Sequence, residues 1–139
     1  MAFAAYLVDT SAFARLSQPR VSAAFAPMAA AGRVKICAPV AFELGFTARN
    51  AAEHAGIMHR LEAFETAPVT ESDHRRALDI QQLLARRGHH RALSLVDALV
   101  AAIAENCSLT VLHYDADFEM VSAVTGQPNQ WIVPRGTAD

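Results

Sequence analysis

The stretch YLVDTSAF, residues 6–13, decides how this chain folds. A short apolar run, residues 4–8, ends at Asp9, which two hydroxyl residues follow. This pattern predicts a buried strand that leads directly into a capped helix. In an open sheet of parallel strands, ligands bind outside the carboxyl ends of the strands. We therefore expect the carboxylate of Asp9 at the edge of the sheet where a binding site forms.

Short β-rich runs and helical stretches alternate along the rest of the chain. Pro39 marks the start of a helix that carries Glu43 in about its first turn, and Ser72 is expected to cap a helix that ends near Gly88. Further strands are predicted at residues 34–38, 68–70, 109–113 and 131–133, and further helices at residues 12–16, 21–31, 53–65, 94–104 and 118–124. This alternation predicts an α/β fold with a parallel sheet covered on both faces, in one domain over residues 1–139.

The composition excludes several classes of protein. Of the 139 residues, 53% are hydrophobic and 19% charged, which is typical of a globular protein and not of a disordered one. A formal net charge of -2 predicts no protein-wide attraction for nucleic acid, so a polyanion would have to bind at a local site. The single lysine, Lys35, is a poor candidate for Schiff-base chemistry or for a P-loop.

The cysteines and the N-terminal stretch bear on the cellular compartment. Cys37 and Cys107 lie in apolar stretches and are spaced neither as a C-x-x-C pair nor as zinc ligands. We expect both thiols to be reduced core groups, which fits a cytoplasmic protein. Because the N-terminal stretch has no basic region and Asp97 interrupts the longest apolar run, we predict neither a signal peptide nor a membrane span.

Four acidic residues are predicted where strands or loops lead into helices: Asp9, Glu43, Asp97 and Asp115. Mg²⁺ and Mn²⁺ prefer oxygen ligands and bind through a few carboxylates, waters and substrate phosphates. Without a cation, mutual repulsion would raise the pKa of some of these carboxyl groups, so neutralisation by a metal is the sensible arrangement. A carboxylate that is not a metal ligand could then act as a base.

Each acid also has a purely structural interpretation. Asp9 could cap the helix that follows it, and Asp97 occupies the third position of a capping box. Asp115 and Asp117 lie in a turn, where acids often form local hydrogen bonds. Glu43 could lie on an exposed helix face, although its apolar neighbours suggest a buried carboxylate that needs a metal or an arginine.

At this point the chain resembles the PIN-domain ribonucleases, and more closely the VapC toxins of bacterial VapBC toxin-antitoxin pairs. The resemblance rests on YLVDTSAF at Tyr6, APVAFELGF at Ala38, SLVDALVAAIAE at Ser94 and VLHYDADFE at Val111. It extends to Trp131 and so covers nearly the whole chain.

The resemblance implies a compact three-layer α/β/α sandwich with a central parallel sheet. It also implies that an acidic quartet holds Mg²⁺ or Mn²⁺, the four residues being Asp9, Glu43, Asp97 and Asp115. By position, Asp9 and Asp97 look like the principal metal ligands, while Glu43 and Asp115 complete the site or order water. Enzymes of this kind cleave RNA by means of a metal-activated water.

The resemblance assigns supporting roles to the neighbours of these acids. Ser11 or Thr10 would orient Asp9, and Asp117 would be auxiliary. His113 departs from the pattern, because many PIN domains carry a hydroxyl residue there. A histidine at this position could hydrogen-bond an acid or a phosphate, or it could be a structural residue at the end of a strand, so it is not placed among the catalytic residues.

The function that the resemblance implies is that of a divalent-metal-dependent endoribonuclease, the toxin of a type II toxin-antitoxin pair. Its partners would be a cognate VapB-type antitoxin, an RNA substrate and a second copy of the chain. Two other classes stay open: another metal-dependent nuclease or phosphatase, and a catalytically quiet PIN-like binding module. The serine at residue 11 counts against an aspartyl-phosphate phosphatase, and the complete quartet counts against the quiet module.

Two further groups of residues have alternative interpretations. The segment of residues 86–91, RRGHHR, could carry phosphates toward the acidic pocket, or it could be a solvated helix end whose arginines match the helix dipole. Apolar residues at helical spacings are expected in the core or on a dimer or antitoxin surface. They are Phe25, Met28, Phe42, Phe46, Met58 and Leu61.

Overall fold

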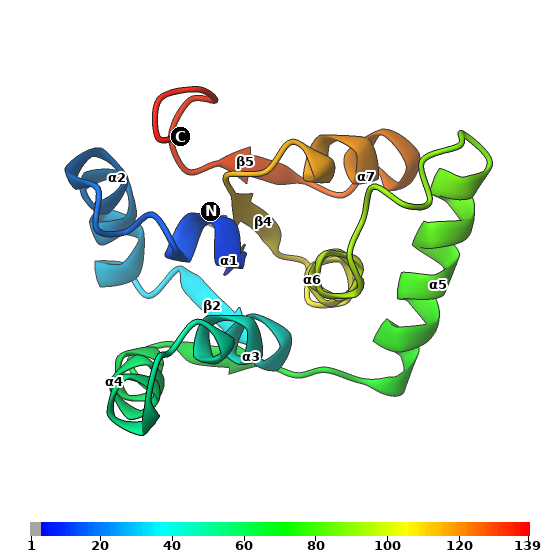
Figure 1. Ribbon diagram of the computed structural model, residues 1–139. Helices are drawn as coiled ribbons and strands as arrows, with labels where there is room; N and C mark the ends of the chain where they lie inside the picture. Colours follow the sequence, from blue (N-terminus) through cyan, green and yellow to red (C-terminus); the bar gives the residue numbers. More distant parts are fainter. Residues whose placement is uncertain (1–3) are drawn as a thin grey trace.

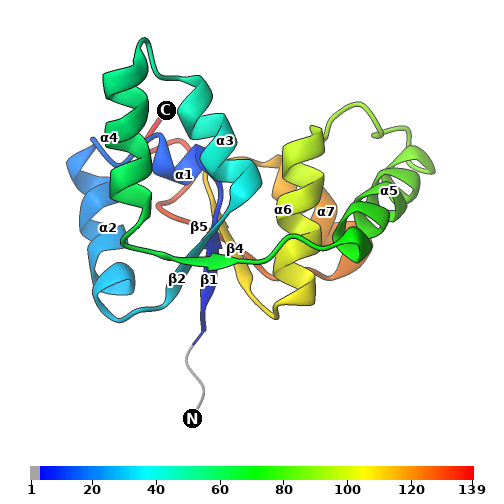
Figure 2. The ribbon, with the colours of Figure 1, turned by 90° about the horizontal axis from the view of Figure 1, so that it is seen from below.

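A computed structural model describes residues 4–139 and contains a five-stranded sheet with helices on both sides (Figures 1 and 2). The strands are β1 Tyr6–Val8, β2 Val34–Cys37, β3 Glu65–Ala67, β4 Thr110–His113 and β5 Asn129–Trp131. They are all parallel, in the order β3-β2-β1-β4-β5. The order along the sheet reverses between β1 and β4, and this is the switch point at which open α/β sheets place their ligands.

The helices follow the strands in a regular alternation. They are α1 Thr10–Phe13, α2 Pro19–Ala30, α3 Ala38–Phe46, α4 Ala51–Leu61, α5 Glu71–Ala85, α6 Leu95–Asn106 and α7 Asp117–Thr125. Because parallel strands need a crossover between them, each connection between successive strands carries at least one helix, and α7 alone joins β4 to β5. The predicted α/β class with a parallel sheet is confirmed.

Side chains of the central strands alternate between the two faces of the sheet. Leu7 and Val111 join a core that includes residues of α3, α5 and α6. Tyr6, Val8 and Leu112 join a second core with residues of α1, α2 and the C-terminal segment. This packing on both faces produces the predicted three layers.

Helix α6 is the most deeply buried of the helices in the described part of the chain. Every residue from 98 to 104 is buried, so the helix has apolar contacts on nearly all sides, as its sequence predicted. It packs against α5, α3, β4, β1 and α7. This position places Asp97, in the first turn of α6, near Asp9 and Asp115, which follow the carboxyl ends of β1 and β4.

The segment between α4 and β3 differs from the prediction. Helix α4 ends at Leu61 and not at residue 65, and the strand predicted at residues 68–70 lies instead at Glu65–Ala67. That strand is fixed by pairing with β2, which local sequence does not reveal. Pro68 then ends it, since proline has no N–H to continue the ladder. The other predicted strands and helices overlap the observed ones.

The cap of α5 also differs from the prediction. Thr70, and not Ser72, is the N-cap, because its side-chain oxygen accepts the N–H of Asp73 at 3.2 Å. The carboxylate of Asp73 accepts the N–H of Thr70 in return, at 2.9 Å, which completes a capping box. Thr70 lies two residues before Ser72, and its reciprocal bonds with Asp73 make it the cap.

The apolar residues with helical spacings separate into two groups. Phe25 and Leu61 are buried, as expected for core residues. Phe42 and Phe46, on α3, are 77% and 84% exposed, and with Met58 they line an apolar groove of about 460 Å³ between α3 and α4. Such exposed rings are typical of a surface that contacts another chain.

The two cysteines are free, and Cys37 is buried while Cys107 is half-buried. Burial raises the pKa of the Cys37 thiol to about 11, so this thiol is not a nucleophile at neutral pH. Among residues 4–139, no helix has the length and apolar character that a bilayer crossing requires.

Candidate metal centre

Asp9 connects β1 to α1 and is 2% exposed. Its Oδ2 accepts hydrogen bonds from the backbone N–H and the hydroxyl of Ser11, at 3.0 and 2.6 Å, so it does cap α1. Its Oδ1 is buried and has no hydrogen-bond partner in the described part of the chain. Burial raises the pKa of Asp9, and the charges of Glu43 and Asp115 raise it further. Capping therefore uses one oxygen and leaves the other available to a cation.

The two hydroxyl residues after Asp9 support different carboxylates. Ser11 Oγ donates to Asp9 and accepts the backbone N–H of Tyr114 at 2.9 Å, which ties the end of β1 to the end of β4. Thr10 Oγ1 donates to Glu43 Oε1 at 2.6 Å. Of the two candidates for orienting Asp9, the structure thus gives Ser11 that contact and gives Thr10 the contact to Glu43.

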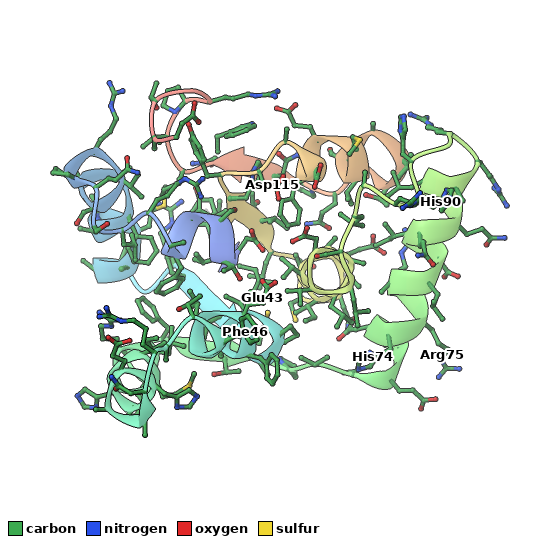
Figure 3. The ribbon with its side chains drawn as sticks, in the orientation of Figure 1. Glu43, Phe46, His74, Arg75, His90 and Asp115 are labelled. Atoms are coloured by element: carbon green, nitrogen blue, oxygen red, sulfur yellow. The ribbon has the colours of Figure 1, made fainter. Side chains whose placement is uncertain are left out.

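Glu43 is the sixth residue of α3, near the start of the helix, as the sequence predicted. Its side chain is half-buried and reaches α1 through Thr10. The carboxylate extends from α3, while Asp115 extends from the turn between β4 and α7 (Figure 3). Glu43 therefore approaches the centre from a helix side and not from a strand end.

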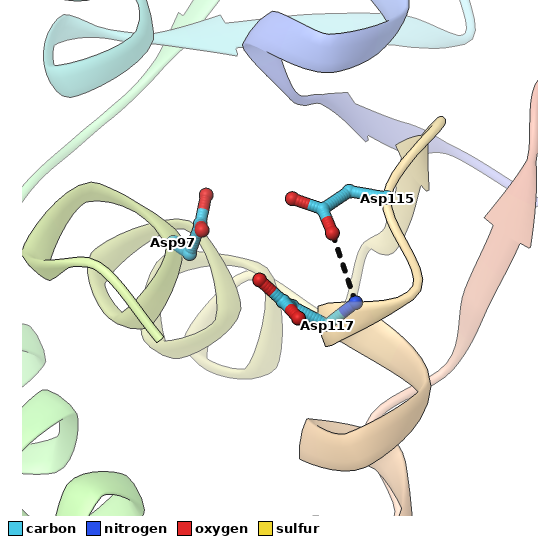
Figure 4. Close-up of side chains that lie close together, drawn as sticks. All are labelled: Asp97, Asp115 and Asp117. Carbon is cyan, nitrogen blue, oxygen red and sulfur yellow. Dashed lines mark hydrogen bonds between the residues drawn. The ribbon is translucent and has the colours of Figure 1, made fainter. Parts of the chain in front are cut away.

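Asp97 is the third residue of α6, and its backbone N–H donates to Ser94 Oγ at 3.1 Å. No returning bond from the Ser94 N–H to its carboxylate is formed among the described residues, so the predicted capping box is only half complete. The carboxylate instead faces Asp115 and Asp117 (Figure 4). Burial, followed by the charges of Asp9 and Asp115, raises the pKa of Asp97 to about 7.

Asp115 and Asp117 complete a close group with Asp97. One carboxylate oxygen of each of the three lies within 4.8 Å of the others. Asp115 Oδ1 also accepts the backbone N–H of Asp117 at 2.9 Å, which is the local turn bond expected of such acids (Figure 4). Partial burial and the charge of Asp115 raise the pKa of Asp117. Asp117 thus lies inside the cluster, although the sequence gave it only an auxiliary place.

His113 is a supporting residue that the sequence candidates left out. It is fully buried, its Nδ1 accepts the backbone N–H of Asp115 at 3.0 Å, and its Nε2 lies 2.8 Å from Asn129 Oδ1. Because Nδ1 accepts, Nε2 carries the proton and donates to Asn129. Burial lowers the pKa of His113, which favours this neutral form. The sequence signal for this role was the position of His113 at the end of a strand, two residues before an acid.

The neighbouring charges that raise the pKa of Asp9 belong to Glu43 and Asp115. Those that raise the pKa of Asp97 belong to Asp9, Asp115 and Glu43, so all of them are carboxylates. Such a concentration of negative charge calls for a cation. The donors are all carboxylate oxygens, which suit hard divalent ions such as Mg²⁺ and Mn²⁺. The unpartnered Oδ1 of Asp9 is the clearest sign that a ligand belongs here, so the residues fit a divalent metal.

Known proteins share this architecture and sequence. The family model described as PIN domain matches residues 6–124. Ribonuclease VapC51 of Mycobacterium tuberculosis is 51% identical over 134 residues, which cover 96% of this chain and 97% of that protein. A chain of DNA-bound VapBC from Salmonella typhimurium has a TM-score of 0.76 at 17% identity and covers 94% of this chain and 100% of its own. For VapBC-5 of M. tuberculosis the TM-score is 0.64 at 25% identity, covering 95% and 100%.

Proposed function

The chain belongs to the PIN-domain family and, more narrowly, to the VapC ribonucleases, and on this basis we propose that it is a divalent-metal-dependent endoribonuclease. In this proposal it is the toxin of a type II VapBC pair and hydrolyses phosphodiester bonds of RNA. The observation that supports the proposal best is the buried, unpartnered oxygen of Asp9 in a cluster of carboxylates. A catalytically quiet module would have no need to keep such an oxygen free.

We assign the metal site to Asp9, Glu43, Asp97 and Asp115, with Mg²⁺ as the expected ion and Mn²⁺ as a substitute. A bound ion of this kind polarises a phosphate and lowers the pKa of a water. Asp9 offers Oδ1 because Ser11 occupies Oδ2. Asp9 and Asp97 are the principal ligands in this assignment, and Glu43 and Asp115 complete the site or order the attacking water.

The remaining side chains hold these carboxylates in place. Thr10 restrains Glu43, and His113 fixes the backbone of Asp115, whose carboxylate in turn accepts the N–H of Asp117. Because the pKa of Asp97 is raised to about 7, its carboxyl group must lose a proton near neutral pH before it can serve as a ligand. We therefore expect metal binding to release protons.

Two partners in this proposal are supported by the relatives. Proteins named VapC ribonuclease and structures of VapBC complexes support an RNA substrate and a cognate VapB-type antitoxin. The proposal also includes a second copy of the chain and a cytoplasmic location. The exposed rings of Phe42 and Phe46 lie on α3, the helix that also carries Glu43. A partner chain that covers these rings would therefore lie close to the acidic centre.

The test is cleavage of total cellular RNA by purified protein freed of antitoxin, with Mg²⁺, with Mn²⁺ and with EDTA. Asp9→Asn is the inactive variant, and Asp79→Asn, an exposed residue of α5, is the matched control. We expect discrete fragments that require metal and that only Asp9→Asn abolishes. Fragments that persist in EDTA, or with Asp9→Asn, would contradict the metal-dependent mechanism.

A further inference from the structure

The connection between α5 and α6 carries a dense positive charge. Residues 86–91, which we call the basic turn, contain three arginines and two histidines, and every residue of the turn is exposed. The chain as a whole has a formal net charge of -2. The basic turn is therefore a local exception, which is where a polyanion could bind despite the overall charge.

The backbone of the basic turn is held in place, although its side chains are exposed. The N–H groups of Arg87 and His89 both donate to the carbonyl of Leu84, at 3.0 and 2.9 Å, and Gly88 adopts a left-handed φ of 75°. On the far side of the turn, Leu93 packs against two of the hydrophobic cores. The turn is thus fixed at both ends and presents its charged groups to solvent.

The arginines of the basic turn have no acidic partner in the described part of the chain. Arg86, Arg87 and Arg91 form neither a salt bridge nor a side-chain hydrogen bond there. Other arginines of the protein do pair with an acid, as Arg76 does with Glu105. Three unneutralised guanidinium groups in six residues are available to phosphate, which they can bind with two parallel hydrogen bonds.

The basic turn lies at the same end of the molecule as the acidic cluster. In Figure 2 the connection between α5 and α6 leads to the first turn of α6, at the end of the sheet toward which the strands run. Figure 3 labels His90 in this turn and Asp115 in the cluster. Asp97 lies six positions after Arg91, so their Cα atoms cannot be more than about 22 Å apart. A strand of RNA could therefore contact both regions within a few nucleotides.

We propose that the basic turn binds backbone phosphates of the RNA substrate beside the bond that is cleaved. This inference rests on the proposed ribonuclease function and adds a binding surface to it. The carboxylates of the centre repel RNA, and the arginines of the turn offset that repulsion next to the site. Such contacts position the strand and do not read its bases, so they contribute affinity and not sequence preference.

The competing explanation is local. Arg86 and Arg87 follow the last turn of α5, where cations interact favourably with the helix dipole. This role predicts lower thermal stability when the arginines are replaced and no change in RNA binding. The proposal predicts the opposite pattern, so the two can be separated by measuring both quantities.

The test compares two triple variants with the same loss of charge. Arg86→Ser/Arg87→Ser/Arg91→Ser changes the basic turn, and Arg20→Ser/Arg60→Ser/Arg75→Ser changes arginines of α2, α4 and α5 that are exposed elsewhere. Both variants are made in the Asp9→Asn protein, so that the RNA stays intact. Their affinities for a fluorescein-labelled single-stranded RNA are then measured. We expect the first variant to bind on the order of 10- to 100-fold more weakly, and the slope of log K against log salt to fall by about 2.

Kinetics and rescue complete the design. With Asp9 restored, the basic-turn variant should show a higher KM and a largely unchanged kcat. The lysine version Arg86→Lys/Arg87→Lys/Arg91→Lys should recover part of the binding, because it restores the charge but not the paired hydrogen bonds. Equal binding by both serine variants, or a loss confined to thermal stability, would overturn the proposal. So would unchanged RNA affinity with weaker antitoxin binding, since the occupant would then be a protein.

Failure of the further inference is distinguishable from failure of the proposed function. If the wild type cleaves RNA and the basic-turn variant behaves like its control, only the phosphate contacts are wrong. If the wild type neither cleaves nor binds RNA with metal present, the ribonuclease proposal itself fails, and the basic turn with it.

Discussion

Two helices of this protein begin with the same sequence pattern, a hydroxyl residue followed three positions later by an aspartate. At α5 the pattern is Thr70 to Asp73, and both reciprocal hydrogen bonds of a capping box are formed. At α6 it is Ser94 to Asp97, and only the bond to the serine hydroxyl is formed in the described structure. The same local signal therefore gives a closed structural cap in one place and a free carboxylate in the other.

The surroundings of the two aspartates explain the difference. Asp73 is 1% exposed and its carboxylate accepts the backbone N–H of Thr70, so its charge has a partner within its own helix end. Asp97 lies beside Asp115 and Asp117, and its pKa is raised to about 7 by burial and by neighbouring carboxylates. An aspartate that leaves a capping box open next to other acids thus indicates a ligand site.

The largest effect should come from exchanging each aspartate for its amide. Asp97→Asn is expected to reduce metal-dependent RNA cleavage on the order of 100-fold or more, because it removes a proposed ligand, and even indirect supports of metal ligands contribute up to that much. Asp73→Asn should leave cleavage within about twofold, since the amide oxygen can still accept the Thr70 N–H. Initial rates on total RNA with Mn²⁺ measure both. Equal losses of RNA cleavage in the two variants would show that the aspartates at the starts of α5 and α6 do not differ in function.

Ser11 supplies a second, smaller effect on cleavage. Like Thr70, it satisfies one oxygen of an aspartate at a helix start, but it also links Asp9 to the N–H of Tyr114. Ser11→Ala should lower cleavage by about 10-fold to 100-fold, the usual range for residues that orient a metal ligand. Ser72→Ala, next to the closed capping box, is the control and should not change the rate. Full activity of the Ser11→Ala variant would show that Asp9 keeps its position without the Ser11 hydroxyl.

The pH dependence of stability should report on Asp97 when metal is absent. The folded-state pKa of Asp97 lies above its ordinary value of 3.8, at about 7, so between these values the folded protein holds more protons than the unfolded chain. Stability should therefore be highest at the acidic end of this window and fall as the pH rises through it. The other carboxylates facing Asp97 are those of Asp9, Glu43, Asp115 and Asp117.

Thermal unfolding in EDTA, followed across this pH window, measures the effect. Asp97→Asn should flatten the decline in stability. Adding Mn²⁺ to the wild type should raise the stability most at the alkaline end, where the carboxylates are ionised. Stability that rises with pH in EDTA would contradict the raised pKa of Asp97.

The smallest effect concerns the caps themselves. Thr70→Ala and Ser94→Ala each remove a side-chain oxygen that accepts a backbone N–H, and each should lower the free energy of unfolding by about 1 kcal/mol. Urea unfolding measures the difference. Thr70→Ala should not affect cleavage, because its helix end is closed and lies outside the cluster. A much larger loss of unfolding free energy for Ser94→Ala would mean that Ser94 stabilises more of the structure than the start of α6.

The sequence predicted most of the architecture for reasons that are local. An apolar run before Asp9, a helical apolar stretch after Asp97 and glycine at residue 126 each mark an element through its own neighbours in the chain. The strand at Glu65–Ala67 was misplaced because its position depends on pairing with β2. Local preference cannot identify a partner strand that is distant in the sequence.

The candidate residues of the site were also named from the sequence, but their contacts were not. Nothing in the sequence assigned Thr10 to Glu43, His113 to the backbone of Asp115, or Asp117 to the group around Asp97. These contacts join segments from different strands and helices. They depend on distances in space, which spacing along the chain does not fix.

The sequence by itself determined the strand and helix alternation and placed acids near the carboxyl ends of β1 and β4, because hydrophobic periodicity and capping act over a few residues. Only the tertiary structure decided which acid serves its own helix and which serves the centre. Asp73 and Asp97 share one motif, and packing surrounds only Asp97 with other carboxylates. The physical reason is that charge interactions act through space, so the fate of a carboxylate depends on neighbours that the fold brings to it.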